Sequence, residues 1–364
     1  MLTLLDRYII RQFSATFLFS IFALCVIFLI VNVMESLDKF IDQQVPIITV
    51  ASYYLNFLPE IIKLLTPIAM LMAALFSIGR LSNLNEITAM KSGGMSLYRL
   101  MLPLFLFSVI ITGLHLYFNG WIVPESNKKK LSIERSELRK TEQSSTIFNV
   151  YLRDSDTRNV ALNYYDGVQK QGNGITIEEY TSEDHPRVSK RIDAETIRWD
   201  TLRNVWVAGN AQQRILKNDS SFSFTFSSYN NLDVQLAMQH QDIVRLQQSP
   251  SELTFDEQRN YLALLERGGK DIRMQMIEYY GQYAFPFAKI IVILFAIPFA
   301  SIRKKSGLAV EIATAMVVSF LYLAFTKIGQ NLGYSLELEP MIIGWLPNII
   351  FFIVAILNIL RMRT

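Results

Sequence analysis

The sequence contains one cysteine and three histidines, and both scarcities exclude classes of site. Cys25 lies inside a long apolar stretch, so we expect no disulfide, no thiolate metal site and no cysteine nucleophile. The histidines His115, His185 and His240 lie far apart, and His115 falls in an apolar stretch where it is expected to hydrogen-bond to another helix. The motifs G-x-x-x-x-G-K-S/T, G-x-S-x-G and H-E-x-x-H are missing. We therefore predict no catalytic residues, no metal and no cofactor.

Charged residues are also scarce, at 18% of the chain against 51% hydrophobic residues. The formal net charge of +3 is too small to indicate nucleic-acid binding. A helix that spans a bilayer needs about 20 predominantly apolar residues. Two sets of three such stretches, separated by a long polar stretch, predict six transmembrane helices in a 3 + 3 arrangement. The predicted spans are Ser14–Met34, Pro59–Gly79, Leu100–Pro124, Tyr279–Ile302, Gly307–Ile328 and Pro340–Leu360.

Lysine and arginine gather in the short loops on one side of these spans. Basic loops stay in the cytoplasm, so we expect both termini there and the long polar stretch outside. The segment Leu2–Phe13, before the first span, is predicted to be a short amphipathic helix lying at the membrane interface. The basic loop residues are Arg7, Arg11, Arg80, Lys91, Arg99, Arg303, Lys304, Lys305, Arg361 and Arg363.

The polar stretch begins with a charged stalk, Glu125–Gln143, and then shows short runs of alternating apolar and polar residues. Many short strands without helices between them predict an all-β sandwich or open barrel, such as a jelly roll. The predicted strands are Ile147–Leu152, Val160–Tyr164, Gly174–Tyr180, Ile192–Trp199, Asn204–Val207 and Ser221–Phe226. The predicted turns are Asp166-Gly167, Gly172-Asn173-Gly174 and Asn218-Asp219.

A helix is expected to return the chain to the membrane after this domain. Thr254 and Glu257 form a predicted capping box, and Gly268-Gly269 is a predicted C-cap. The resulting organisation is residues 1–124 with spans one to three, 125–253 with stalk and β domain, 254–278 as connecting helix, and 279–364 with spans four to six.

The loop between the second and third spans, residues 82–94, is predicted to form a short helix. Ile87 and Met90 lie along one side of it, and a glycine pair that includes Gly93 closes it. Two interpretations of Glu86 remain open. It caps the helix together with Asn83 three residues earlier, or it is the charged contact of a coupling helix that docks on a cytoplasmic motor protein.

Several short motifs, in their order around the 3 + 3 arrangement of spans, make the chain resemble the LptF/LptG family of lipopolysaccharide-export permeases over nearly its whole length. The resemblance rests on Leu5-Asp-Arg-Tyr-Ile9, Leu58-Pro59, Pro67-Ile-Ala-Met-Leu71, Gly79-Arg-Leu-Ser-Asn-Leu-Asn-Glu86, Ser92-Gly93, Trp121-Ile-Val-Pro124, Ala296-Ile-Pro-Phe299 and Trp345-Leu-Pro-Asn348. The opening residues favour the LptG-like paralogue.

This resemblance implies a permease in the bacterial inner membrane with a periplasmic jelly roll. It implies four partners: a dimer of cytoplasmic ABC ATPases, a paralogous permease, a periplasmic jelly-roll bridge protein, and lipopolysaccharide as the substrate taken from the outer leaflet. The coupling-helix glutamate of the family falls on Glu86, and the energy source is another chain. Other lipid or lipoprotein-export permeases, and a membrane-anchored β-domain sensor or scaffold, are the alternatives.

Four lysines map to the outer half of the membrane region or its edge: Lys39, Lys63, Lys289 and Lys327. An amine in or near hydrocarbon is costly and tends to be functional, so we predict that they bind phosphates of the lipid. The alternatives are snorkelling to the interface and, for Lys63, a pair with Glu60.

Three aromatic residues, Phe222, Phe224 and Phe226, share one face of a predicted strand. Period-2 alternation is expected to direct all three inward. They either fill the core of the β domain or line a slide for the acyl chains of the lipid.

Overall fold

The computed structural model describes residues 3–137, 146–181, 187–216, 224–245, 248–267, 271–301, 308–333, 335 and 337–361. The chain divides into two compact units. The helical unit comprises Met1–Leu138 and Arg273–Thr364, and the β unit comprises Arg139–Ile272. The predicted fold class, an α-helical membrane protein with an inserted all-β domain, is confirmed at this level.

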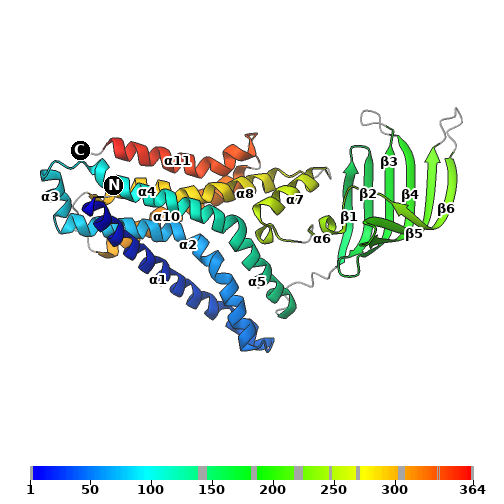
Figure 1. The fold of residues 1–364 in the computed structure, drawn as a ribbon, viewed down its shortest axis with the longest axis horizontal. Helices are drawn as coiled ribbons and strands as arrows, with labels where there is room; N and C mark the ends of the chain where they lie inside the picture. Colours follow the sequence, from blue (N-terminus) through cyan, green and yellow to red (C-terminus); the bar gives the residue numbers. More distant parts are fainter. Residues whose placement is uncertain are drawn as a thin grey trace. The chain divides into compact units, whose positions relative to one another are not determined.

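The first half of the helical unit contains three long helices, two shorter ones and a π-helical turn. They are α1 (Leu4–Asp42), α2 (Ile47–Asn83), the short α3 (Glu86–Ser92), α4 (Leu97–Tyr117), the π-helical turn η1 (Phe118–Ile122) and α5 (Val123–Glu137). α4, η1 and α5 follow one another without a break, so the predicted stalk starts as a helical continuation of the third span. In Figure 1, α3 and both chain termini lie at one end of this unit.

The predicted interfacial helix over Leu2–Phe13 is not a separate element, which corrects that expectation. α1 begins at Leu4, with Thr3 and Asp6 forming a capping box, and continues unbroken into the first span. Ile9 and Phe13 are 2% and 0% exposed and belong to the core of the helical unit. Burial of these side chains against neighbouring helices explains why the segment stays in line with the span.

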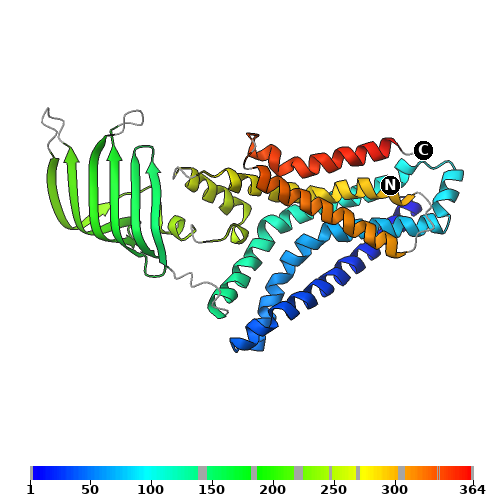
Figure 2. The ribbon, with the colours of Figure 1, turned by 180° about the vertical axis from the view of Figure 1, so that it is seen from behind.

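The second half of the unit contains α8 (Arg273–Ala284), the 3₁₀ turn η3 (Phe285–Phe287), α9 (Ala288–Ser301), α10 (Leu308–Gly333) and α11 (Pro340–Leu360). Five helical segments of the described residues are long and apolar enough to span a membrane. The remaining predicted span coincides with α10, a helix of 26 residues. The predicted fourth span is therefore present, and it contains the 3₁₀ turn η3 between α8 and α9. α8 is labelled in Figure 1, and Figure 2 shows the same helices from behind.

α2 and α9 contribute many of the buried side chains in the core of the helical unit. α2 packs on α1 and α9, and its small residues Ala69, Ala73 and Ala74 are 0% exposed. Large apolar side chains on α1, α4, α10 and α11 are instead exposed, among them Phe22 at 68% and Phe320 at 71%. Apolar exposure on this scale suits a surface that faces lipid or another membrane helix.

The β unit is one six-stranded sheet in which every strand pairs antiparallel with the next along the chain. The strand order, β1 to β6, follows the sequence, and the strands form the all-β domain that was predicted. The strands are β1 (Thr146–Ser155), β2 (Arg158–Asp166), β3 (Gln171–Tyr180), β4 (Val188–Asp200), β5 (Val205–Leu216) and β6 (Phe224–Val234).

One face of this sheet forms the core of the β unit. Inward residues such as Leu162, Ile177 and Trp206 are each 1% exposed. Met238 and Ile243, from the segment after β6 and the helix α6 (His240–Arg245), close over the same cluster. The opposite face of the sheet carries the polar residues that alternate with this set.

Turn predictions in the β unit have mixed outcomes. Asp166-Gly167 starts the β2–β3 turn, as predicted, but Gly172-Asn173-Gly174 is wrong because it lies inside β3. Gly174 has φ +64°, and a Cβ there would meet the side chain of Asn163, so glycine is needed for local geometry within the strand. Asn218-Asp219 and the C-cap Gly268-Gly269 lie outside the described residues.

The helix α7 (Phe255–Arg267) begins with the predicted capping box. The Thr254 backbone N–H donates to Glu257 Oε2 at 2.9 Å, and the Glu257 N–H donates to Thr254 Oγ1 at 3.3 Å. This prediction is confirmed.

Candidate functional site

The loop predicted to couple the protein to a motor forms α3, between α2 and α4. Asn85 is the N-cap, in the left-handed region at φ 59°, and its side chain makes no capping hydrogen bond. Asn83 belongs to α2, so the interpretation in which Asn83 and Glu86 cap this helix together is wrong. Gly93 is the C-cap, and it is followed by Gly94 at φ 84°, a conformation that favours glycine.

Glu86 lies in the first turn of α3 and is held from α1. The Tyr8 hydroxyl donates to its two carboxylate oxygens, at 3.4 and 3.2 Å. Ile87, predicted to be part of the coupling helix, is 4% exposed and packs into the core, so it anchors α3 on the helical unit. Met90 is half-buried against the same core, while Lys91 and Gly93 are exposed.

The first turn of α1 is tied to the start of α4 as well. Arg99 donates to Asp6 Oδ2 at 2.8 Å, and the same carboxylate oxygen accepts from the Thr3 backbone N–H at 2.8 Å. The segment that contains α3 is therefore fixed by one contact from α1 to α3 and one from α1 to α4. This arrangement presents a rigid, half-exposed carboxylate at the end of the unit where the termini lie (Figure 1).

The four predicted phosphate-binding lysines occupy different environments. Lys39 and Lys327 are exposed and Lys63 is half-buried. Lys289 is 0% exposed, and its ammonium contacts His115 Nδ1 and the Pro286 carbonyl inside the helix bundle. The prediction that Lys289 binds a lipid phosphate is therefore wrong, because its ammonium group is buried inside the helix bundle. The prediction that His115 makes a hydrogen bond to another helix agrees with its contact with Lys289 of α9.

The Lys289–His115 contact borders the break between α8 and α9. Proline has no backbone N–H, so Pro286 leaves the carbonyl of Gln282, four residues earlier, without its helical donor. Asn119, in η1, supplies that donor through its side-chain amide, with Nδ2 2.9 Å from the Gln282 oxygen. Asn119 is 2% exposed, so the hydrogen bond is shielded from water.

A second carbonyl at the break is capped from another helix. The Ala288 N–H turns to the Phe285 carbonyl, which frees the Ala284 carbonyl. Asn348 Nδ2 of α11 donates to it at 2.6 Å, and Asn348 Oδ1 accepts from the Tyr322 hydroxyl of α10 at 2.8 Å. α8 and α11 pack closely beside this point, because a Cβ on Gly344 would lie 2.8 Å from the Gly281 nitrogen.

These contacts form what we call the carbonyl hub. Its members are Thr112, His115, Asn119, Lys289, Tyr322 and Asn348, together with the carbonyls of Gln282, Ala284 and Pro286. Irregular backbone inside a membrane protein is tolerated where neighbouring side chains satisfy its polar groups. The hub therefore satisfies the carbonyls that the 3₁₀ turn η3 leaves without a helical donor, and it connects α8 and α9 to α4, α10 and α11.

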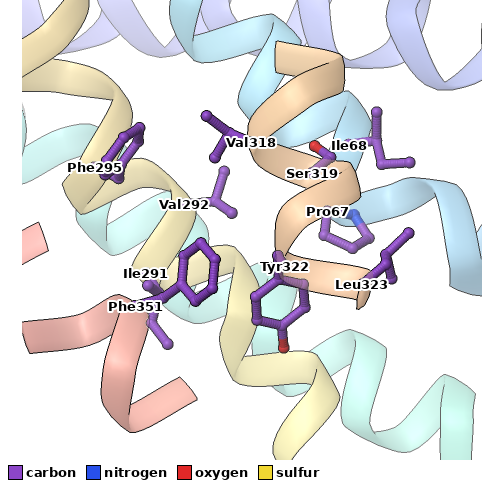
Figure 3. A pocket seen from close by; sticks show the side chains of 10 residues that line it. All are labelled: Pro67, Ile68, Ile291, Val292, Phe295, Val318, Ser319, Tyr322, Leu323 and Phe351. Atoms are coloured by element: carbon purple, nitrogen blue, oxygen red, sulfur yellow. The ribbon is translucent and has the colours of Figure 1, made fainter. Parts of the chain in front are cut away.

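A narrow apolar pocket adjoins Tyr322 between α2, α9, α10 and α11. Figure 3 shows the ring of Tyr322 beside that of Phe351, with Pro67 and Val292 on the neighbouring helices. The Tyr322 and Phe351 ring centroids are 5.4 Å apart in an edge-on arrangement. The lining is almost entirely apolar, so this pocket offers no group for chemistry.

At the end of the unit opposite to α3, contacts join α2 to the stalk helix α5. Lys130 Nζ lies 2.6 Å from Glu60 Oε2 and 4.6 Å from the centre of the Phe57 ring. The Tyr53 hydroxyl donates to Glu134 at 2.8 Å. The pairing of Glu60 with Lys130 links two helices, a role that the suggested Glu60–Lys63 pair would not have.

The phenylalanines of β6 do not fill the core. Phe224 and Phe226 are 46% and 72% exposed, which corrects the expectation that alternation directs them inward, and Phe222 lies outside the described residues. β6 is the last strand of the sheet, and its residues are exposed along most of its length. Within the part of the chain that the structure describes, no buried layer covers the rings at this end of the strand.

The sequence analysis did not predict the carbonyl hub, apart from the hydrogen bond that His115 makes to another helix. Asparagines inside apolar spans, Asn119 and Asn348, are its signal, because an unpaired amide in hydrocarbon is costly. No feature of the sequence indicates that Tyr8 is the partner of Glu86, because an exposed tyrosine in an apolar helix is common. Within the described residues, no group of histidine, cysteine, aspartate or glutamate side chains is placed to hold a metal ion.

Comparison with known proteins identifies the family. The profile described as "Lipopolysaccharide export system permease LptF/LptG" matches residues 7–361. The chain is 20% identical over 358 residues to the "Lipopolysaccharide export system permease protein LptG" of Escherichia coli strain K12, covering 98% of each chain. The protein of the same name from Escherichia coli O6:H1 strain CFT073 matches with the same identity and coverage. With two sets of membrane helices flanking a β unit and a family match over almost its entire length, the chain belongs to the LptF/LptG family of lipopolysaccharide export permeases.

Proposed function

We propose that this chain is the transmembrane permease subunit of an ABC transporter. The transporter extracts lipopolysaccharide from the outer leaflet of the bacterial inner membrane and passes it to a periplasmic bridge protein. A separate dimer of cytoplasmic ATPases hydrolyses the ATP, and a paralogous permease completes the membrane part. The observation that carries the proposal is the match of residues 7–361, which includes both sets of helices and the β unit.

Orientation follows from charge. Arg80 lies near the end of α2, Lys91 in α3 and Arg99 near the start of α4. α3 lies at the end of the helical unit with the termini (Figure 1), and a basic connection between spans favours the cytoplasm. We infer that α3 faces the ATPase and that the β unit is periplasmic. Glu86, held by Tyr8, is then the charged contact between the permease and a basic residue of the ATPase.

The lipid contacts are proposed for the lysines that stay accessible. Lys39 and Lys327 are exposed and Lys63 is half-buried, so each can reach a phosphate at the membrane surface or in a lateral opening. The exposed rings of Phe224 and Phe226 remain candidates for contact with acyl chains, because no core covers them.

The test is purification of the tagged chain in mild detergent followed by mass spectrometry of its partners. We expect an ABC ATPase and a second permease of the same family to co-purify. Glu86→Ala should reduce recovery of the ATPase, because removing one member of a buried interfacial charge pair costs about 2–5 kcal/mol. Glu35→Ala, which changes an exposed glutamate at the other end of α1, is the matched control. Purification without an ATPase would contradict the proposal.

A further inference from the structure

We propose that the outer face of strands β1 to β3 is a binding site for a saccharide. A depression of about 460 Å³ lies on this face, opposite the side that forms the core of the β unit. The lining includes Leu152 and Val160, whose side chains belong to the core, but most of its residues alternate with this buried set, so their side chains point away from the core. The depression therefore belongs to the surface of the sheet and has no part in packing the β unit.

The strand register explains why the surface is hollowed here. Tyr151 of β1 pairs with Ala161 of β2, and Ala161 pairs with Thr176 of β3. Ala161 is the smallest of the three side chains and lies between the other two, so it forms a floor with a wall on each side. Neighbouring Cβ atoms in such pairs lie about 4.5–5.5 Å apart, which brings both walls within reach of one sugar ring.

The walls carry the groups that saccharides need. The Tyr151 ring is 72% exposed, and a flat aromatic face can stack on the C–H face of a pyranose. Asn159 and Asn163 are exposed on the same face of β2, two positions to either side of Ala161. An amide has two donor hydrogens and an acceptor in one plane, which matches adjacent hydroxyls on a sugar. Asn159 uses part of this capacity in a hydrogen bond with Tyr180.

The charges beside the depression are already engaged within the protein. Glu178 accepts from Arg191 at 3.1 Å and from the Tyr180 hydroxyl at 2.7 Å. Arg153 donates to the Asp156 carbonyl at 2.5 Å. The carboxylate of Glu178 in the lining disfavours a phosphate, and an acyl chain would need an apolar floor wider than one alanine. A neutral polar ligand with C–H faces fits these surroundings best.

This inference deepens the proposed function, on which the identity of the natural glycan rests. A glycolipid carries its sugars outside the membrane, and the depression lies on the terminal strand β1 and its neighbours β2 and β3. The site would hold the sugar portion of the transported lipid, or of a free glycan, while the acyl chains are held elsewhere.

The experiment measures binding without transport, so it separates this site from the proposed function. The full-length chain in nanodiscs is mixed with delipidated core oligosaccharide, prepared from lipopolysaccharide by mild acid hydrolysis. Saturation-transfer difference NMR then detects contact between protein and sugar C–H groups. A second arm uses lipid A without core sugars as competitor.

We expect sugar signals that fall at least fivefold in Tyr151→Ala and persist in Tyr151→Phe, which keeps the ring. Tyr229→Ala, which removes an aromatic ring on β6 that is 41% exposed, should leave them unchanged. Lipid A, whose only sugars are two acylated and phosphorylated glucosamines, should not displace the oligosaccharide; displacement would show that the site does not select the core sugars and would overturn the proposal. Absence of signals at millimolar oligosaccharide, or equal signals in Tyr151→Ala and the wild type, would also overturn it.

Discussion

The carbonyl hub makes a quantitative prediction about Asn119. Asn119→Leu keeps the approximate side-chain volume and removes the amide that donates to the Gln282 carbonyl at 2.9 Å. Pro286 has no N–H to offer, so in this variant the carbonyl stays buried without a donor. The variant should therefore unfold more easily.

The expected loss follows from two measured ranges. An orphaned buried polar group costs about 1–3 kcal/mol in proteins generally. Hydrogen bonds between membrane helices average about 0.6 kcal/mol and reach about 1.7 kcal/mol. Asn119 is 2% exposed and its partner carbonyl has no helical donor, which favours a large loss. Asn119 Oδ1 accepts no hydrogen bond within the described residues, so its removal offsets part of that loss, and we expect about 1 kcal/mol.

Reversible unfolding in mixed micelles, titrated with SDS, measures this loss. Asn56→Leu is the control, because Asn56 Nδ2 donates to the Ser52 carbonyl within its own helix in an exposed setting. Pro286→Ala provides the decisive second variant, since an alanine at this position can return an N–H to the Gln282 carbonyl. In the Pro286→Ala background, Asn119→Leu should cost clearly less. Equal losses in both backgrounds, or a loss no larger than that of Asn56→Leu, would refute the reasoning.

Three further predictions concern charge, orientation and pH. Lys39→Glu should impair lipopolysaccharide loading more than Lys39→Ala, because reversal adds repulsion of phosphate to the lost attraction; equal, wild-type export in both would favour snorkelling. In a cysteine-free background, a cysteine at Asn173 should react with a membrane-impermeant thiol reagent in cells with a permeable outer membrane, and one at Ser92 should not; labelling at Ser92 would reverse the orientation. Burial and the nearby Lys170 lower the pKa of His240 below its ordinary value near 6.5. The folded state therefore takes up this proton less readily than the unfolded state, so the stability of the β unit, followed by thermal unfolding, should fall as the pH drops below about 6.5, and His240→Gln should weaken that dependence.

The membrane helices could be predicted because apolar length alone specifies them. The break in the fourth span could not. Pro67, Pro103 and Pro347 lie inside unbroken helices, whereas Pro286 lies in the 3₁₀ turn that ends α8. Proline is thus a sign of a freed carbonyl, but the side chains that cap it decide whether the helix bends or breaks. Those side chains come from distant parts of the chain.

The contact of Lys289 likewise depends on a residue far away in the sequence, which local patterns do not show. Position along a span predicts that a lysine is costly, but not the direction in which its side chain points. Its partner His115 is 174 residues away in the sequence, so no local pattern could pair the two. The exposed lysines at the ends of spans, such as Lys39, are easier to place because no neighbouring helix covers them.

In the β unit, alternation located the strands and divided each into two faces. It did not indicate which face is buried. Phe224 and Phe226 have the apolar pattern of a core strand, but β6 closes the sheet at its last position and leaves them exposed. Strand order is also set by the short connections between neighbours, which the sequence shows only as turn residues.

The central claim is that this chain moves lipopolysaccharide with energy supplied by a separate ATPase bound at α3. The most direct test reconstitutes the purified complex in proteoliposomes that contain lipopolysaccharide, with the purified bridge protein carrying a photo-crosslinking residue as acceptor. The account predicts ATP-dependent crosslinks between lipopolysaccharide and the bridge protein, which disappear with Glu86→Ala and remain with Glu35→Ala. Crosslinks that form equally without ATP, or ATP hydrolysis by the intact complex without any transfer, would contradict it.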